Sequence, residues 1–125
     1  MTNKRYEKGY KQMEKMFGSE MTQTIRERLE AISKDFSTYQ FEAFGSIYGR
    51  KLLDTKTREL ITIAALTTLG HATNQLKVHL KGALRAGCTP EELIEVIMQM
   101  SLYAGFPAAL NALYTAKEVF DEEDD

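Results

Sequence analysis

The clearest helix boundary of this chain lies in residues 86–104, which read AGCTPEELIEVIMQMSLYA. Thr89 is placed to cap a helix, Pro90 suits the first helical position, and Glu92 completes a capping box with Thr89. Gly87 suits the left-handed position that follows a helix end. We therefore predict one helix that ends just before Gly87 and a second that runs from Pro90 to the end of this stretch.

Apolar residues recur at spacings of three and four along most of the remaining chain, a pattern typical of helices that bury one face. Further helices are predicted from about residue 3 to 17, from a cap at Thr22 or Thr24, and over residues 36–48, 56–69, 74–86 and 107–120. No segment alternates apolar and polar residues as a half-buried strand would. The predicted fold class is therefore all-α.

The chain has 125 residues, enough for one domain and too few for two ordinary ones. We expect a single domain over residues 1–125, with N-terminal helices in 1–47, a core in 48–120 and an acidic tail, DEEDD, in 121–125. Five neighbouring like charges repel one another, so the tail is expected to be solvated.

The charge balance limits the possible partners. The chain has 16 Lys and Arg against 18 Asp and Glu, a net charge of −2, so nothing draws it as a whole to nucleic acid or to an anionic membrane. The longest apolar run, residues 60–69, is far shorter than the roughly 20 residues of a transmembrane helix. We expect neither a nucleic-acid partner nor a membrane.

Cys88 is the only cysteine, which excludes an intrachain disulfide, a CxxC redox pair and a Cys-rich metal site. No HExxH or EF-hand pattern occurs, so no metal site is expected. The cysteine usage and the lack of an apolar leader favour the cytoplasm. Cys88 itself is expected to fill space rather than to act as a nucleophile.

Two predicted helices have unusually wide apolar faces. Over residues 90–104 the acidic and amide side chains gather on a sector of roughly 100°, and most of the remaining arc is apolar. The helix of residues 60–69 is apolar nearly all round. A surface helix of a small monomer has a narrower stripe, so we expect a homo-oligomer. The alternative is a monomeric bundle with these two helices at its centre.

His79 is the most informative single position. Leu76, Leu80 and Ala83 place it on the apolar side of its helix, where an imidazole is at least partly buried and its nitrogens need partners. A hydrogen-bonded core histidine and a functional histidine both fit this pattern. The other histidine, His71, is expected in a connection.

Arg58 and Glu59 open an otherwise apolar helix. They could form a capping or surface ion pair, or one of them could turn inward, where a buried charge needs a partner. Tyr48-Gly49-Arg50 is a weak signal for an anion-binding corner.

At these residues the sequence resembles the carboxymuconolactone decarboxylase family. The resemblance covers most of residues 48–119, through YGR at 48–50, LDxxTRELIT at 53–62, LxxHxxxA at 76–83, AGCTxEExxEV at 86–96 and YAGFPAA at 103–109. It implies an all-helical subunit, an alkylhydroperoxidase D-like helical bundle, assembled into homotrimers or homohexamers.

The resemblance points to one of two chemical branches. The branch similar to the alkylhydroperoxidase uses a CxxC pair that ends four residues before a histidine. Aligned on His79, the two cysteine positions are occupied here by Ala72 and Gln75, so the disulfide relay of that branch cannot operate.

The other branch decarboxylates 4-carboxymuconolactone without a metal or an organic cofactor. Loss of CO2 sends electrons through the ring double bond onto the lactone carbonyl, so the site must stabilise an oxyanion, protonate a ring carbon and hold the remaining carboxylate. The resemblance implies His79 as the acid and Glu59 as its orienting partner or proton relay. The residues expected to bind the substrate are Arg58 or Arg50, as a clamp for the carboxylate, with Tyr48, Gln75 and Tyr103.

This chain departs from the decarboxylase pattern at two places. Gln75 stands where those enzymes tend to have glutamate, and the chain lacks the tryptophan expected in the segment aligned with residues 47–50. Glutamine can donate to an oxyanion but cannot relay a proton. The expected function is therefore decarboxylation of a small carboxylated lactone or a related acid. The alternatives are a homo-oligomeric binding protein without catalysis, and a redox protein that uses Cys88 between subunits.

Overall fold

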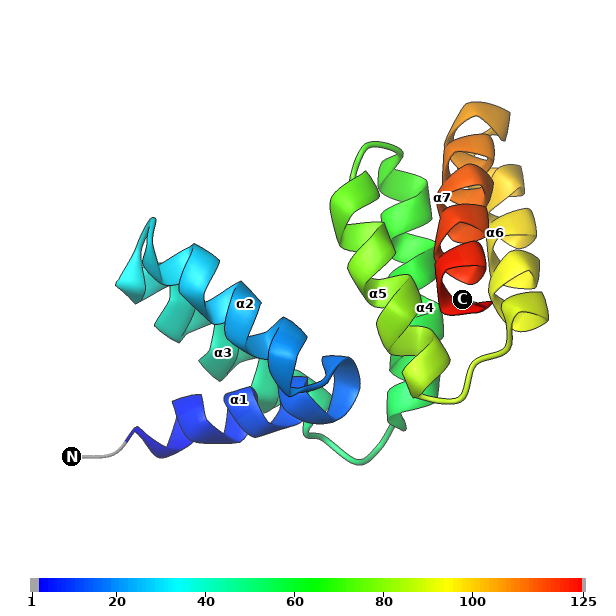
Figure 1. The fold of residues 1–125 in the computed structure, drawn as a ribbon. Helices are drawn as coiled ribbons and strands as arrows, with labels where there is room; N and C mark the ends of the chain where they lie inside the picture. Colours follow the sequence, from blue (N-terminus) through cyan, green and yellow to red (C-terminus); the bar gives the residue numbers. More distant parts are fainter. Residues whose placement is uncertain (1–2, 125) are drawn as a thin grey trace. The chain divides into compact units, whose positions relative to one another are not determined.

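The structure, a computed structural model, describes residues 3–124, with side chains up to residue 123. It contains helices and no strands in this part of the chain, which confirms the all-α prediction (Figure 1). The helices are α1 (Lys4–Phe17), α2 (Ser19–Glu30), α3 (Lys34–Tyr48), α4 (Thr55–Leu69), α5 (Thr73–Arg85), α6 (Pro90–Ala104) and α7 (Phe106–Asp124). Within the described residues, no helix combines the length and the continuous apolar character that a membrane-spanning segment requires.

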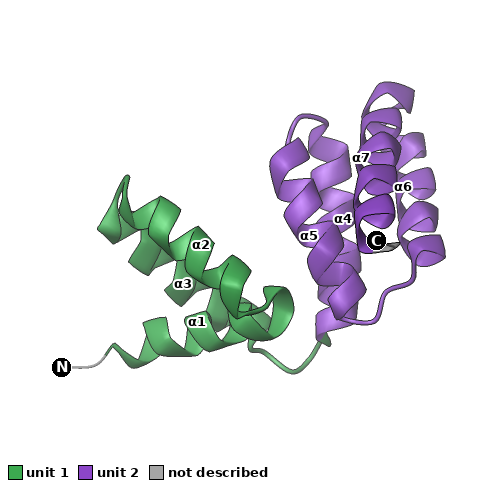
Figure 2. Ribbon diagram, viewed as in Figure 1, with its two compact units in different colours: residues 1–54 green, residues 55–125 purple. Residues whose placement is uncertain are grey.

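The chain forms two units, residues 1–54 with α1 to α3 and residues 55–125 with α4 to α7 (Figure 2). In unit 1, α1 packs along α3, and α2 lies against both. The two long helices approach closely because Gly9 of α1 faces Gly45 of α3, and a Cβ atom on Gly9 would overlap the carbonyl group of Phe41. The buried Phe41 ring lies 5.1 Å from Tyr6 and 5.3 Å from Tyr10, between ring centroids.

Unit 2 is a four-helix arrangement around one hydrophobic core. Each of α4 and α7 packs against both α5 and α6, and α4 also touches α7. Each helix contributes a buried stripe, as the apolar periodicity predicts. The core includes Ile63, Leu76, Leu80, Ala83, Cys88, Leu93, Ile97, Ala109, Ala112, Ala116 and Val119.

The predicted boundary between α5 and α6 is confirmed. The Thr89 hydroxyl accepts from the Glu92 N–H at 3.1 Å, and the Glu92 carboxylate accepts from the Thr89 N–H at 2.9 Å. Gly87 has a φ of +100°, the left-handed conformation that glycine adopts without strain.

The prediction of a helix cap at Thr22 or Thr24 is wrong. Helix α2 already begins at Ser19, because Gly18, with a φ of +89°, turns the chain directly from α1 into α2. Thr22 lies inside the helix and is fully buried, and its hydroxyl donates to the Gly18 carbonyl at 2.8 Å.

The end predicted for the last helix, near Phe120, is also wrong. Helix α7 continues to Asp124, so the acidic residues extend the helix, while Asp125 lies outside the described residues. Lysines offset the repulsion between the acidic side chains, since Lys117 pairs with Asp121 at 2.8 Å and Lys81 of α5 pairs with Glu122 at 3.2 Å. A further pair joins α5 to α7 just before this segment, between Lys77 and Glu118.

Candidate active site

Glu59 is a charged side chain in the core of unit 2. It begins the buried stripe of α4, followed at successive turns by Ile63 and Thr67, and none of its surface is exposed. A buried carboxylate needs a hydrogen-bond or charge partner, because leaving it unpaired costs several kcal/mol. Of the two possibilities for the start of this helix, the structure therefore shows an inward-turned residue, Glu59.

His79 of α5 is the partner of that carboxylate. Its Nδ1 atom lies 3.3 Å from each of the two Glu59 carboxylate oxygens. The imidazole is 15% exposed, so it stands at the edge of the core with the carboxylate on its inner side. The two residues are 20 positions apart in the sequence, and the packing of α5 on α4 brings them together.

This contact assigns roles to the two ring nitrogens. An ionised carboxylate only accepts hydrogen bonds, so the proton in the contact belongs to Nδ1. The contact with the carboxylate therefore uses Nδ1 and not the other ring nitrogen, Nε2. A histidine held in this way by a carboxylate is the usual arrangement of an oriented general acid or base.

The start of α4, one turn before Glu59, is fastened to α6. The Lys56 ammonium lies 3.1 Å from the Glu92 carboxylate, and the Lys56 carbonyl lies 3.8 Å from the Cys88 sulfur. These contacts hold the first turn of α4 at the loop and cap that open α6. The sequence pattern did not predict this ion pair, because Lys56 and Glu92 are far apart in the sequence and lie on different helices.

Cys88 has only 4% of its surface exposed and belongs to the core of unit 2. This burial agrees with the expected space-filling role. A thiol in this position cannot meet a second thiol from another molecule unless the core opens, so the burial weighs against the redox alternative.

The other expected site residues fall into two groups. In unit 2, Arg58 is partly buried next to Glu59, Gln75 is exposed one turn before His79, and Tyr103 of α6 is 75% exposed. In unit 1, Tyr48 ends α3 with its ring stacked on Phe44 at 4.3 Å, and the exposed Arg50 follows. Among these expected site residues, the structure brings His79 into direct contact with Glu59.

His71 lies exposed in the connection between α4 and α5, as expected. Within residues 3–124, no three histidine, cysteine, aspartate or glutamate side chains gather in a way that could hold a metal ion.

Comparison with known proteins places these features in a family. Residues 34–118 match the model of the carboxymuconolactone decarboxylase family. The chain is 35% identical over 119 residues to 4-carboxymuconolactone decarboxylase of Acinetobacter baylyi, a match that covers 94% of this chain and 88% of that protein. It is 25% identical over 119 residues to nitrosuccinic acid decarboxylase of Metarhizium robertsii, covering 94% of this chain and 82% of that protein.

A third relative, an uncharacterized 15.0 kDa protein of Paracoccus denitrificans, is 46% identical over 83 residues, which are 66% of this chain and 62% of that protein. The family match contains both Glu59 and His79, so it covers the contact described above. The chain belongs to the carboxymuconolactone decarboxylase family.

Proposed function

We propose that this protein is a decarboxylase that acts on a small carboxylated lactone or a related acid, with no metal or organic cofactor. The contact of His79 with the buried Glu59 carries the proposal, because it supplies an oriented proton donor at the edge of a core. Two relatives with decarboxylase names, matching 94% of the chain, support the reaction class.

The names of those relatives also suggest a substrate class. 4-Carboxymuconolactone and nitrosuccinic acid are both small acids with two carboxyl groups and an electron-accepting group. One carboxyl group can leave while the other remains for a cation to hold. We propose Arg58 or Arg50 for that clamp, with Tyr48, Gln75 and Tyr103 contributing to substrate binding.

In the proposed step, the bond between the carboxylate carbon and its neighbouring carbon breaks and CO2 leaves. The electron pair passes to the accepting group, as an oxyanion in the lactone, and Gln75 is the proposed donor to that oxyanion. The proton on His79 Nε2 then goes to carbon, and the bond electrons return from the oxyanion. Glu59 accepts from the N–H of Nδ1 and so holds the ring in place during this transfer.

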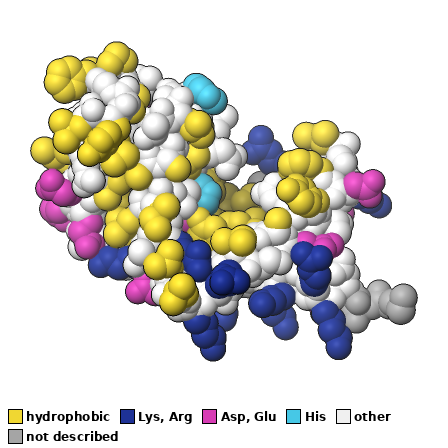
Figure 3. Space-filling model, turned by 180° about the vertical axis from the view of Figure 1, so that it is seen from behind, with side chains coloured by type: hydrophobic (Ala, Val, Ile, Leu, Met, Phe, Trp, Pro, Cys, Tyr) yellow, Lys and Arg dark blue, Asp and Glu magenta, His cyan; other side chains and the backbone are white. Residues whose placement is uncertain are grey.

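We further propose that the protein works in the cytoplasm as a homo-oligomer, a trimer or a hexamer. Exposed apolar side chains on α6 and α7 support self-association, and hydrophobic side chains gather on the surface of unit 2 seen in Figure 3. The exposed apolar side chains of α6 and α7 include Met98, Leu102, Tyr103, Phe106, Leu110 and Tyr114. Large exposed apolar patches are typical of association surfaces.

The decisive experiment measures CO2 release from 4-carboxymuconolactone and from nitrosuccinate by the wild-type protein, His79→Ala and the control His71→Ala. We expect turnover by the wild type and by the control, and a fall of about 10²- to 10⁴-fold in kcat for His79→Ala. Wild-type turnover by His79→Ala would overturn the role of His79. A ligand-induced rise in Tm without any turnover would instead indicate a binding protein.

A further inference from the structure

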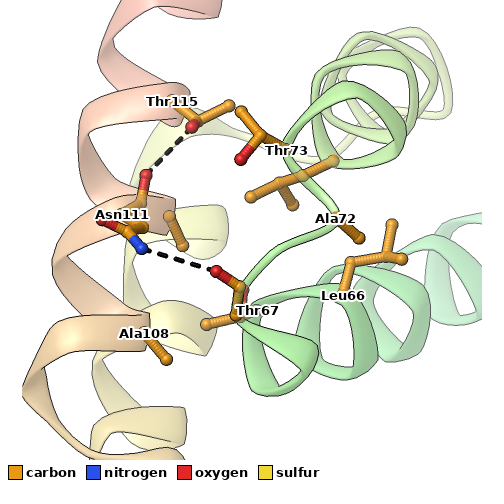
Figure 4. Close-up of a pocket in the computed structure, with 10 residues that line it drawn as sticks. Leu66, Thr67, Ala72, Thr73, Ala108, Asn111 and Thr115 are labelled. Atoms are coloured by element: carbon orange, nitrogen blue, oxygen red, sulfur yellow. Dashed lines mark hydrogen bonds between the residues drawn. The ribbon is translucent and has the colours of Figure 1, made fainter.

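A small pocket, partly open to the surface, lies in unit 2 where the end of α4, the start of α5 and α7 meet (Figure 4). It has room of about 10 Å³ for the centre of a water molecule. That is about the space that a single buried water needs. Its wall is mixed. Thr67, Gly70, Thr73 and Asn111 supply polar atoms, and apolar side chains such as Leu66 and Leu76 line the rest.

The Thr67 hydroxyl is the first observation that points to a ligand. Thr67 is 1% exposed, and its Oγ1 atom has no hydrogen-bond partner within the described part of the chain. Other helical threonines donate to the carbonyl four residues earlier, each at 2.9 Å: Thr62 to Arg58, Thr68 to Ala64 and Thr115 to Asn111. The hydroxyl of Thr67 makes no such bond, although an unpaired buried hydroxyl is costly.

The start of α5 is the second observation. Ala72 occupies the N-cap position, and its methyl group cannot accept a hydrogen bond, so no side chain caps this helix. The first N–H groups of a helix need acceptors, and at the start of α6 Thr89 and Glu92 satisfy this need. Ala72 and Thr73, where α5 begins, form part of the cavity wall beside Thr67.

The opposite wall supplies further polar atoms. Asn111 of α7 donates through Nδ2 to the Gly70 carbonyl at the long distance of 3.4 Å. The cavity therefore offers hydrogen-bond donors and acceptors from three helices and the connection between two of them. A water molecule, which donates and accepts at once, suits such a mixed lining better than an ion of either sign.

We propose that one ordered water binds in this cavity, bonded to Thr67 Oγ1 and to the first peptide N–H groups of α5, and serves as the missing cap of that helix. This site goes beyond the proposed function, because it does not depend on any reaction. It joins the end of α4 to the start of α5, the two helices that carry Glu59 and His79. The water thereby helps to hold the relative position of those helices.

The test replaces Thr67 by valine, which has nearly the same shape and no hydroxyl. The matched control is Thr68→Val, at the neighbouring exposed position whose hydroxyl bonds to Ala64. A second variant, Thr67→Ser, keeps the hydroxyl. All are compared as full-length chains by thermal unfolding and by amide hydrogen exchange, and the wild type is also crystallised at high resolution.

If the water is bound, Thr67→Val lowers the Tm by about 4 °C or more relative to Thr68→Val. It also speeds exchange in the first turn of α5 but not in the capped first turn of α6, and Thr67→Ser keeps the slow exchange. The wild-type crystal shows water density within hydrogen-bond distance of Thr67 Oγ1. If no water is bound, the change in Tm has the opposite sign, because Thr67→Val then removes an unpaired buried hydroxyl and raises the Tm. A raised or unchanged Tm, or a crystal without that density, overturns the proposal.

Discussion

His79 Nδ1 lies 3.3 Å from both carboxylate oxygens of Glu59, and the carboxylate is completely buried while the ring is 15% exposed. The carboxylate that orients the ring is therefore shielded from water, and the ring itself is only slightly exposed. Glu59 orients the ring through Nδ1, and the proposed proton transfer uses the other ring nitrogen, Nε2.

The first prediction concerns Glu59 as a positioning residue. Glu59→Gln keeps the size of the side chain but replaces one of the two accepting oxygens by an amide group that donates, so it holds Nδ1 less firmly. We expect kcat to fall with little change in KM, and the free energy of unfolding to fall by about 1–3 kcal/mol. Steady-state kinetics and urea unfolding measure the two effects, with Glu95→Gln, at an exposed position of α6, as the control. A wild-type kcat over the whole pH range would show that the carboxylate only stabilises the fold.

The second prediction concerns the capping box of α6. The Thr89 N–H bond, followed by the nearby Lys56 ammonium, lowers the pKa of Glu92 from its ordinary value of 4.5. A lowered pKa in the folded state gives stability that is present above pH 4.5 and is lost as the pH falls through the folded value. We expect Glu92→Gln to have a lower Tm than the wild type at pH 7. This difference in Tm should shrink as the pH falls, because the wild-type carboxylate then becomes protonated. Glu91→Gln is the control, since it removes the same charge from the same helical turn but leaves the capping box of Thr89 and Glu92 intact.

The third prediction tests the close approach of α1 and α3. In an ordinary exposed helix, Gly→Ala raises the stability by about 1 kcal/mol. Gly9→Ala should do the reverse and cost about 1–3 kcal/mol, because the new methyl group meets the Phe41 carbonyl. Thr24→Ala is the control. It introduces alanine at an exposed position of α2, so it changes helix propensity without a new interhelical contact. Chemical denaturation of the three proteins checks the sign, and a gain in stability for Gly9→Ala would refute the contact.

The fourth prediction tests self-association through the apolar surface of α6 and α7. Leu102 and Phe106 are 78% and 75% exposed, so a charge at either position should leave the fold of the subunit intact. We expect the double variant Leu102→Glu/Phe106→Glu to have a lower mass in solution than the wild type, by light scattering after size-exclusion chromatography. Gln99→Glu adds a charge at an exposed polar position of α6 and should leave the mass unchanged. A monomeric wild type would refute the proposed oligomer.

The errors in the predicted helix boundaries have specific causes. Threonine is a common helix cap, so the sequence predicts one at Thr22 or Thr24, but a single glycine, Gly18, makes the whole turn between α1 and α2. The sequence shows the mutual repulsion of the acidic residues after Phe120 and therefore predicts a solvated tail there, whereas α7 continues to Asp124. The offsetting contact of Lys81 with Glu122 comes from another helix and has no local signal.

By itself, the sequence determined the helical class, the boundary between α5 and α6, and the resemblance to the family. Capping depends on groups within one helical turn, and periodicity depends on a single helix, so both can be recognised along the chain. Only the tertiary structure decided that Glu59 turns inward, that His79 meets it, and that the hydroxyl of Thr67 is buried without a partner. These facts depend on how α4, α5 and α7 pack together, because burial and interhelical contact are properties of the assembled core and not of any one segment.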